Sequence, residues 1–150
     1  MSFARFSLKG RALKLLARRE HSRLELERKL AAHAQEGDDL NAILDELEQR
    51  GFISAQRVVE SVMHRKASRF GAARVLHELR AKGLDEDALR AAAGQLRATE
   101  PQRAHALWLQ RFGAPPATPQ ERLRQARFLA ARGFAADVIG RVVRGGGAEE

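Results

Sequence analysis

The sequence predicts an all-α fold, drawn out as an elongated, curved stack of three tandem three-helix repeats. Ala, Leu, Arg and Glu, which are strong helix formers, dominate its 150 residues, whereas β-branched residues are few. Apolar residues recur at helical intervals along most of the chain. The pattern returns about every 50 residues, because Leu30, Leu79 and Leu129 occupy equivalent positions.

The first unit, residues 1–51, has three apolar stripes, each of which predicts one helix. Ser22 and Glu25 form a capping box for the second helix, in which the Ser oxygen takes a backbone N–H and the Glu reaches back to the cap. Gly51 follows the third helix, where Gly readily takes the left-handed conformation, and Phe52 can pack back on the last turn. The stripes are Leu13, Leu16 and Ala17; Leu26 and Leu30; and Leu40, Ile43, Leu44 and Leu47.

The second unit, residues 52–98, repeats this plan. Ser54 and Asp85 are suited to cap its helices, and Gly83 lies between a basic and an apolar residue where a helix should end. Three helices are therefore expected here as well. The stripes are Val58, Val59, Val62 and Met63; Val75, Leu76 and Leu79; and Ala88, Leu89, Ala92 and Leu96.

The third unit, residues 99–144, brings the expected total to nine helices. Thr99 is a candidate cap for its first helix, Thr118 precedes a Pro in the capping pattern of its second, and Gly133 ends that helix. Residues 145–150 are expected to form a disordered tail. The stripes are Ala104, Leu107 and Trp108; Leu123, Ala126 and Leu129; and Val138, Ile139, Val142 and Val143.

Composition favours an anionic partner. The formal charge is +8, and Arg supplies most of the 27 basic residues, so bidentate pairing with phosphate or carboxylate is available. Genomic base bias is an alternative source of the Arg excess. The chain has no Cys, which excludes disulfides and thiolate chemistry, and no apolar stretch of the roughly 20 residues that a membrane span needs. We expect a cytoplasmic protein, monomeric and not associated with membranes.

The basic residues are concentrated in the first two helices of every unit. Residues 5–29 contain nine basic and three acidic side chains, residues 57–82 seven and two, and residues 103–132 six and one, whereas residues 36–48 contain six acidic and none basic. Stacked units would align these basic segments along one side. A merely solvated surface with intrahelical pairs, such as Glu25 with Lys29, is the alternative. We favour a binding stripe because the bias recurs in all three units.

Catalytic patterns are missing from the sequence. There is no phosphate-binding Gly-rich loop, no H-E-x-x-H and no Ser nucleophile elbow, and the five His lack ligand spacing. We therefore expect a protein that is not an enzyme and uses no cofactor or metal. Trp108 and Phe112 could stack on bases, but Trp108 lies on an apolar stripe and is expected to be core.

Two segments resemble the RecX family. Residues 16–30 contain an Arg, a Ser, and then Glu-Leu and Lys-Leu at helical spacing, as in the family's opening segment. Residues 71–84 match the family's G-x-x-R-[IV]-x-x-E-L-x-x-K-G pattern at every fixed position, and the resemblance extends over roughly residues 10–144. The chain departs from the family after Phe52, where the family usually shows an acidic pair and then an aromatic-Ala step, whereas residues 53–59 read Ile-Ser-Ala-Gln-Arg-Val-Val. Ser54 can still cap the next helix.

The resemblance implies a regulatory protein in the groove of the RecA recombinase filament on single-stranded DNA. There it would inhibit the recombinase, ATPase and coprotease activities, and so modulate DNA repair and the SOS response; stimulation instead of inhibition stays open. A stand-alone basic helical DNA-binding protein is the alternative. For Arg74, pairing with Glu78 on its own helix is a further possibility. The expected contact residues for the filament or the DNA are Arg18, Arg19, Arg23, Arg65, Lys66, Arg69, Arg74, Arg80, Lys82, Arg124 and Arg127.

Overall fold

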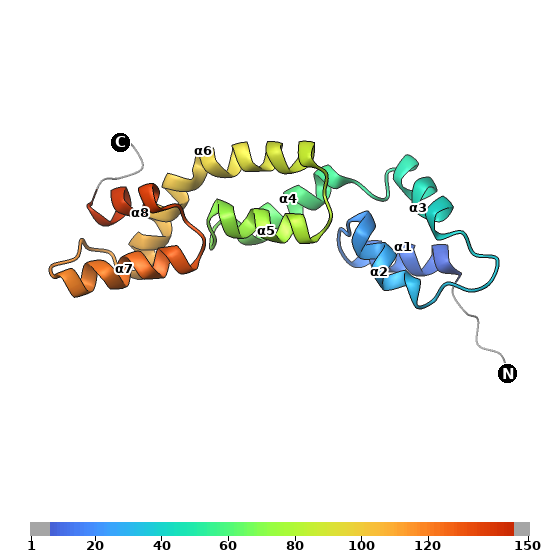
Figure 1. The fold of residues 1–150 in the computed structure, drawn as a ribbon, viewed down its shortest axis with the longest axis horizontal. Coiled ribbons are helices and arrows are strands. Elements are labelled where there is room, and N and C mark those ends of the chain that lie inside the picture. Colours follow the sequence, from blue (N-terminus) through green and yellow to red (C-terminus); the bar gives the residue numbers. More distant parts are fainter. Residues whose placement is uncertain (1–6, 146–150) are drawn as a thin grey trace.

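The computed structural model describes residues 7–145, which form eight helices and no strand (Figure 1). The predicted all-α class is confirmed. The expected disordered tail lies, apart from residue 145, outside the described residues. The helices are α1 (Leu8–Arg18), α2 (Arg23–Ala31), α3 (Leu40–Gln49), α4 (Ala55–Lys66), α5 (Ala72–Ala81), α6 (Glu86–Arg111), α7 (Pro119–Ala131) and α8 (Ala136–Val143).

The molecule is elongated, and its helices follow one another along the long axis in three groups (Figure 1). Each group has its own buried apolar cluster instead of sharing a central core. Leu26, Leu44 and Leu47 are central to the first cluster, Leu79 to the second and Leu129 to the third, and each of these five is fully buried. Most residues of the apolar stripes therefore face local cores, as expected for tandem repeats, but Ala17 and Leu123, which the stripes also included, are exposed.

The expected count of nine helices is wrong, because α6 serves both the second and the third group. Thr99 does not cap a new helix: its hydroxyl donates to the Gln95 carbonyl within α6, at 3.1 Å. Pro101 lies inside the helix and has no N–H, and α6 changes direction along its course in Figure 1. The Arg103 guanidinium bonds the nearby Leu96 carbonyl at 2.7 Å, which satisfies an acceptor beside the irregular turn.

The other predicted helix ends are confirmed. Ser22 and Glu25 form a complete capping box, and the side chains of Ser54, Asp85 and Thr118 each accept a backbone N–H of the first turn. The junction glycines at 51, 83 and 133 all have positive φ, from 78° to 89°. These local signals are reliable because each depends on residues three or four apart.

Candidate functional site

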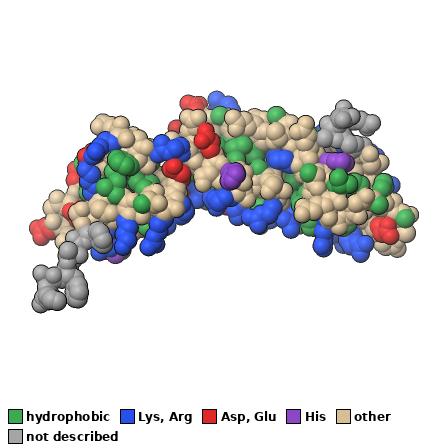
Figure 2. Space-filling model, turned by 180° about the vertical axis from the view of Figure 1, so that it is seen from behind, with side chains coloured by type: hydrophobic (Ala, Val, Ile, Leu, Met, Phe, Trp, Pro, Cys, Tyr) green, Lys and Arg blue, Asp and Glu red, His purple; other side chains and the backbone are tan. Residues whose placement is uncertain are grey.

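The Lys and Arg side chains gather along one edge of the molecule. Figure 2 shows them along the lower, gently concave edge, from the N-terminal helices to the C-terminal group. In Figure 1 the helices on this side are α2, α5 and α7. These are the second helices of the three groups, in the segments where the sequence concentrates its basic residues.

Four cations surround the ring of Phe70, in the turn between α4 and α5. The charged groups of Lys66, Arg69, Arg74 and Arg132 lie 5.4, 5.8, 4.6 and 5.6 Å from the ring centroid. Three of these four were predicted as contact residues. We call Phe70 with these four residues the Phe70 cluster.

Backbone carbonyls and the ring hold this cluster, and carboxylates contribute little to it. Arg74 donates to the Ala131 carbonyl at 3.0 Å, and Arg132 donates to the Arg69 carbonyl at 3.3 Å. Among the described residues, the one ion pair of the cluster joins Lys66 to Glu78 at 3.8 Å. Pairing of Arg74 with Glu78 is therefore not found. The cluster keeps most of its positive charge and presents it in a fixed arrangement.

The cluster extends to a second ring, Phe128 of α7. Arg132 lies 4.8 Å from the Phe128 centroid, so it connects the two rings, and Arg111 lies 5.4 Å from the same ring. Phe112 packs edge-on against Phe128 at 5.4 Å. Alternating aromatic rings and guanidinium groups are suited to phosphates and nucleobases, and also to carboxylates.

Close backbone contact between the second and third groups makes this arrangement possible. The Gly71 N–H donates to the Arg132 carbonyl at 2.8 Å. A Cβ at Gly71 would lie 2.5 Å from the Phe134 nitrogen, and one at Gly133 would lie 2.6 Å from the Arg74 Cβ. Glycine at both positions therefore lets α5 meet the end of α7, which places Arg132 beside Phe70.

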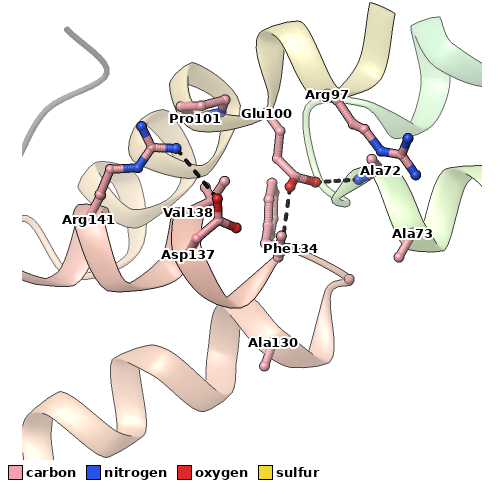
Figure 3. Close-up of a pocket in the computed structure, with 12 residues that line it drawn as sticks. Ala72, Ala73, Arg97, Glu100, Pro101, Ala130, Phe134, Asp137, Val138 and Arg141 are labelled. Carbon is pink, nitrogen blue, oxygen red and sulfur yellow. Dashed lines mark hydrogen bonds and ion pairs between the residues drawn. The ribbon is translucent and has the colours of Figure 1, made fainter. Parts of the chain in front are cut away.

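Glu100 closes the same joint from the side of α6. Its carboxylate is buried and accepts the Ala72 N–H at 2.6 Å and the Ala135 N–H at 3.2 Å; Figure 3 shows the carboxylate directed at Ala72. Neither Gly71 nor Ala135, the N-cap residues of α5 and α8, provides a side-chain cap. One carboxylate therefore caps two helices, and the hollow beside it, with Asp137 and Arg141 at its edge, lies at this joint between the second and third groups (Figure 3).

Arg103 of α6 holds the turn that carries Phe70. Its guanidinium donates to the carbonyls of Ala67 and Phe70, each at 2.7 Å, which fixes the turn that carries Phe70. Burial lowers the pKa of Arg103 from its ordinary value. The sequence reasoning missed Arg103, Glu100 and Arg132, and a signal existed for Glu100: helices that start at Gly71 and Ala135 need an acceptor from elsewhere in the chain.

Three of the predicted contact residues are engaged within the protein. Arg23 lies 2.6 Å from Asp45 and 3.2 Å from Glu48, so it joins α2 to α3. Arg19 and Lys82 both pair with Glu25, at 3.0 and 3.2 Å. These pairs hold the first group together and join it to the second, whereas the alternative pairing of Glu25 with Lys29 is not found.

Glu25 is the charged centre of the joint between the first two groups. Burial raises the pKa of this carboxyl, but the Ser22 N–H, Arg19 and Lys82 outweigh burial and bring the pKa to about 2. The Ser22 hydroxyl also donates to the Lys82 carbonyl at 2.6 Å. Gly83 has a φ of +78°, and a Cβ there would lie 2.6 Å from the Leu24 Cδ2 and 2.9 Å from the Leu24 Cβ, so this joint, like that between the second and third groups, favours glycine.

His21 is buried beside this joint and serves it structurally. Its Nδ1 lies 3.0 Å from the Arg19 carbonyl, which can only accept, so Nδ1 carries the proton and Nε2 accepts from Lys29 at 3.2 Å. Burial lowers the pKa of His21, which keeps the ring neutral.

The remaining predicted residues are exposed, and among the described residues their side chains make no ion pair. Arg18 lines a groove of about 350 Å³ between α1 and α2, together with Arg11 and Lys29. Trp108 is buried, and its indole N–H donates to Gln125 at 2.8 Å, which confirms it as core. The other exposed predicted residues are Arg65, Arg80, Arg124 and Arg127.

Neither a metal site nor a membrane span is found within residues 7–145. No group of three or more His, Asp or Glu side chains in this range could hold a metal ion. None of the described helices combines the length and apolar character that a bilayer crossing demands.

Comparison with known proteins gives a consistent result. The family model for the first three-helix domain of RecX matches residues 9–47, and the model for the third matches residues 98–143. The regulatory protein RecX of Leptothrix cholodnii is 55% identical over 92% of this chain and 88% of that protein, and that of Ralstonia nicotianae is 52% identical over 93% and 87%. The crystal structure of RecX from Lactobacillus salivarius superposes with a TM-score of 0.72 at 19% identity, covering 93% of this chain and 94% of the other. The chain therefore belongs to the RecX family of regulatory proteins.

Proposed function

We propose that this RecX-family protein binds the RecA recombinase filament on single-stranded DNA in the cytoplasm and inhibits its ATPase, recombinase and coprotease activities. It would thereby restrain recombinational repair and the SOS response. We propose that it acts as a monomer, with residues 1–51, 52–98 and 99–144 as its three units, and without a cofactor. The observation that carries the proposal is the Phe70 cluster, in which four cations are held in place with one carboxylate partner among the described residues.

The shape of the molecule supports a filament as partner. A helical nucleoprotein filament offers a long groove, and an elongated molecule with a concave basic edge can follow such a groove over several subunits (Figure 2). The cluster's guanidinium groups can pair with carboxylates of the protein and with phosphates of the DNA. Because these groups are preorganised, little side-chain entropy is lost on binding.

The test is a titration of recombinase ATPase activity on single-stranded DNA with the wild-type protein and with a Lys66→Gln/Arg69→Gln variant. The expected result is an inhibitory concentration at least about thirtyfold higher for the variant, since each lost hydrogen bond costs about 1 kcal/mol or more and two are lost, roughly 2 kcal/mol together. The matched control is Arg90→Gln/Arg97→Gln on the exposed surface of α6, which removes the same charge and should inhibit like wild type. Equal inhibition by all three proteins would refute the role of the cluster.

The same proteins distinguish filament binding from stand-alone DNA binding. A filament regulator should inhibit the ATPase at concentrations well below those at which it binds a naked oligothymidine. If the two concentrations are similar, the alternative of a DNA-binding protein is correct. In that case log affinity for the oligonucleotide falls with log salt, and the Lys66→Gln/Arg69→Gln variant should lower the slope by roughly 1.4, at about 0.7 for each phosphate that is no longer neutralised.

A further inference from the structure

A second exposed surface lies on the C-terminal group. A groove of about 440 Å³ runs between α7 and α8, with Ala126 and Ala130 on one wall and Ile139, Gly140 and Val143 on the other. Its walls are apolar and its residues are mostly small, so another element can approach the backbone closely. The Phe70 cluster does not contribute to this groove.

The groove continues past its end along α7. A second hollow shares Arg122 and Ala126 with the groove and adds Leu123 and Pro116. Leu123 is 49% exposed, one of three large apolar side chains in the described part of the chain that the protein leaves at its surface. The combined strip extends along most of α7, which gives it the length of a helical segment.

The rim of this strip is basic. Arg122, Arg127 and Arg144 line the groove, whereas neither hollow is lined by Asp or Glu. All three are exposed, and none forms an ion pair with a described residue. An apolar strip between unpaired guanidinium groups complements a segment that is apolar on one side and acidic on its flanks.

We propose that the α7–α8 groove binds an acidic amphipathic helix of a partner protein. Apolar side chains of that helix, spaced at i, i+3 or i+4 and i+7, occupy the strip from Leu123 to Val143, and its Glu and Asp residues pair with Arg122, Arg127 and Arg144. Gly140 provides the space at the centre, because a side chain there would project into the groove. The inference does not depend on the Phe70 cluster, which carries the proposed filament binding, because no residue of the cluster lines either hollow; the two proposals share only Arg127 of the expected contact residues.

The test is fluorescence anisotropy with a labelled 18-residue helical peptide that has Leu at i, i+3, i+4 and i+7 positions and Glu at most others. Micromolar binding is expected, and a peptide with Lys in place of each Glu should bind at least tenfold more weakly. Gly140→Leu should also weaken binding at least tenfold. This variant should fold, because a Cβ at Gly140 would lie 3.6 Å from the Arg144 Nη1, an ordinary contact, and Leu favours the helix.

The matched control is Gly94→Leu in α6, the same change at a helical glycine whose Cβ would have no neighbour within 4 Å. It should bind the acidic peptide like wild type. Arg122→Glu/Arg127→Glu should weaken binding at least tenfold, whereas Arg90→Glu/Arg97→Glu should not.

Absence of binding by wild type, or equal binding by Gly140→Leu and Gly94→Leu, would overturn the proposal. The proposal would also be overturned, in favour of a nucleic-acid site, if an oligothymidine displaced the peptide and Gly140→Leu weakened binding of the oligothymidine as well. The anisotropy assay contains no recombinase, so its result can be distinguished from the result of the ATPase titration that tests the proposed function.

Discussion

Replacing Gly71 with Ala should open the joint between the second and third groups and disperse the Phe70 cluster. The backbone of Gly71 has φ −77° and ψ 173°, which Ala adopts without strain, so the added methyl group is the whole perturbation. That methyl would lie 2.5 Å from the Phe134 nitrogen and would overlap the carbonyl group of Gly133, where ordinary contact begins at 3.4 Å. Both neighbours are backbone, so the two groups must separate by about 1 Å.

The cost follows from what this separation breaks. Overpacking of a well-packed interior costs about 1–3 kcal/mol, and loss of the hydrogen bond from Gly71 to the Arg132 carbonyl adds about 1 kcal/mol. The free energy of unfolding should therefore fall by about 2–4 kcal/mol. Arg132 would also move away from Phe70, so the inhibitory concentration in the ATPase titration should rise about tenfold, as expected for loss of roughly 1.4 kcal/mol of binding free energy.

Urea unfolding followed by circular dichroism measures the first effect, and the ATPase titration measures the second. Gly94→Ala is the matched control, because its Cβ has open space and Ala favours the helix, so this variant should gain up to about 1 kcal/mol and inhibit like wild type. The reasoning is refuted if Gly71→Ala unfolds at the same urea concentration as wild type and inhibits equally well.

Three further changes test the joints. Glu100→Gln should lower the free energy of unfolding by about 2–3 kcal/mol, because an amide offers one acceptor where two backbone N–H groups now share a carboxylate; an unchanged urea midpoint would contradict this. Glu25 has a folded pKa of about 2 against an ordinary 4.5, so the stability that it confers is present above pH 4.5 and is lost as pH falls toward 2. Partial exposure limits the loss to about 1–3 kcal/mol, and parallel pH profiles for wild type and Glu25→Gln would contradict it. Ser22→Ala should cost about 2 kcal/mol and Ser54→Ala about 1 kcal/mol, since both cap a helix but Ser22 alone also bonds the Lys82 carbonyl; equal losses would show that this bond contributes nothing.

Sequence predicted those features of the fold that depend on near neighbours. The capping residues and the glycine helix ends were found correctly, because each acts within one turn. The division at Thr99 failed for a physical reason: Thr can cap a helix or bond a carbonyl of its own helix, and Pro101 can start a helix or bend one. Contacts of Glu100 and Arg103 with distant parts of the chain favour the continuous helix. These contacts cannot be predicted from the residues near Thr99 alone.

Prediction of the site was limited in the same way. The concentration of basic residues could be counted from the sequence, and Lys66, Arg69 and Arg74 do meet around one ring. Which cations keep their charge available depends largely on distant carboxylates, however: besides Glu27 on its own helix, Arg23 pairs with Asp45 and Glu48, more than 20 positions away. Arg132 was missed because its contact with Arg69 spans 63 positions.

The two joints differ in construction, and this difference determines where a rigid binding site can lie. The first group is connected to the second through a short link after α3 and through polar contacts around Glu25 and Lys82, which salt and acid weaken. The second and third groups share the continuous helix α6, and the buried Glu100 caps a helix on each side. A cluster of like charges stays together only if the backbone that carries it resists their repulsion. The joint between the second and third groups provides this rigidity. The Phe70 cluster, composed of residues from both sides of that joint, is therefore the part of the basic edge in which preorganisation favours binding most.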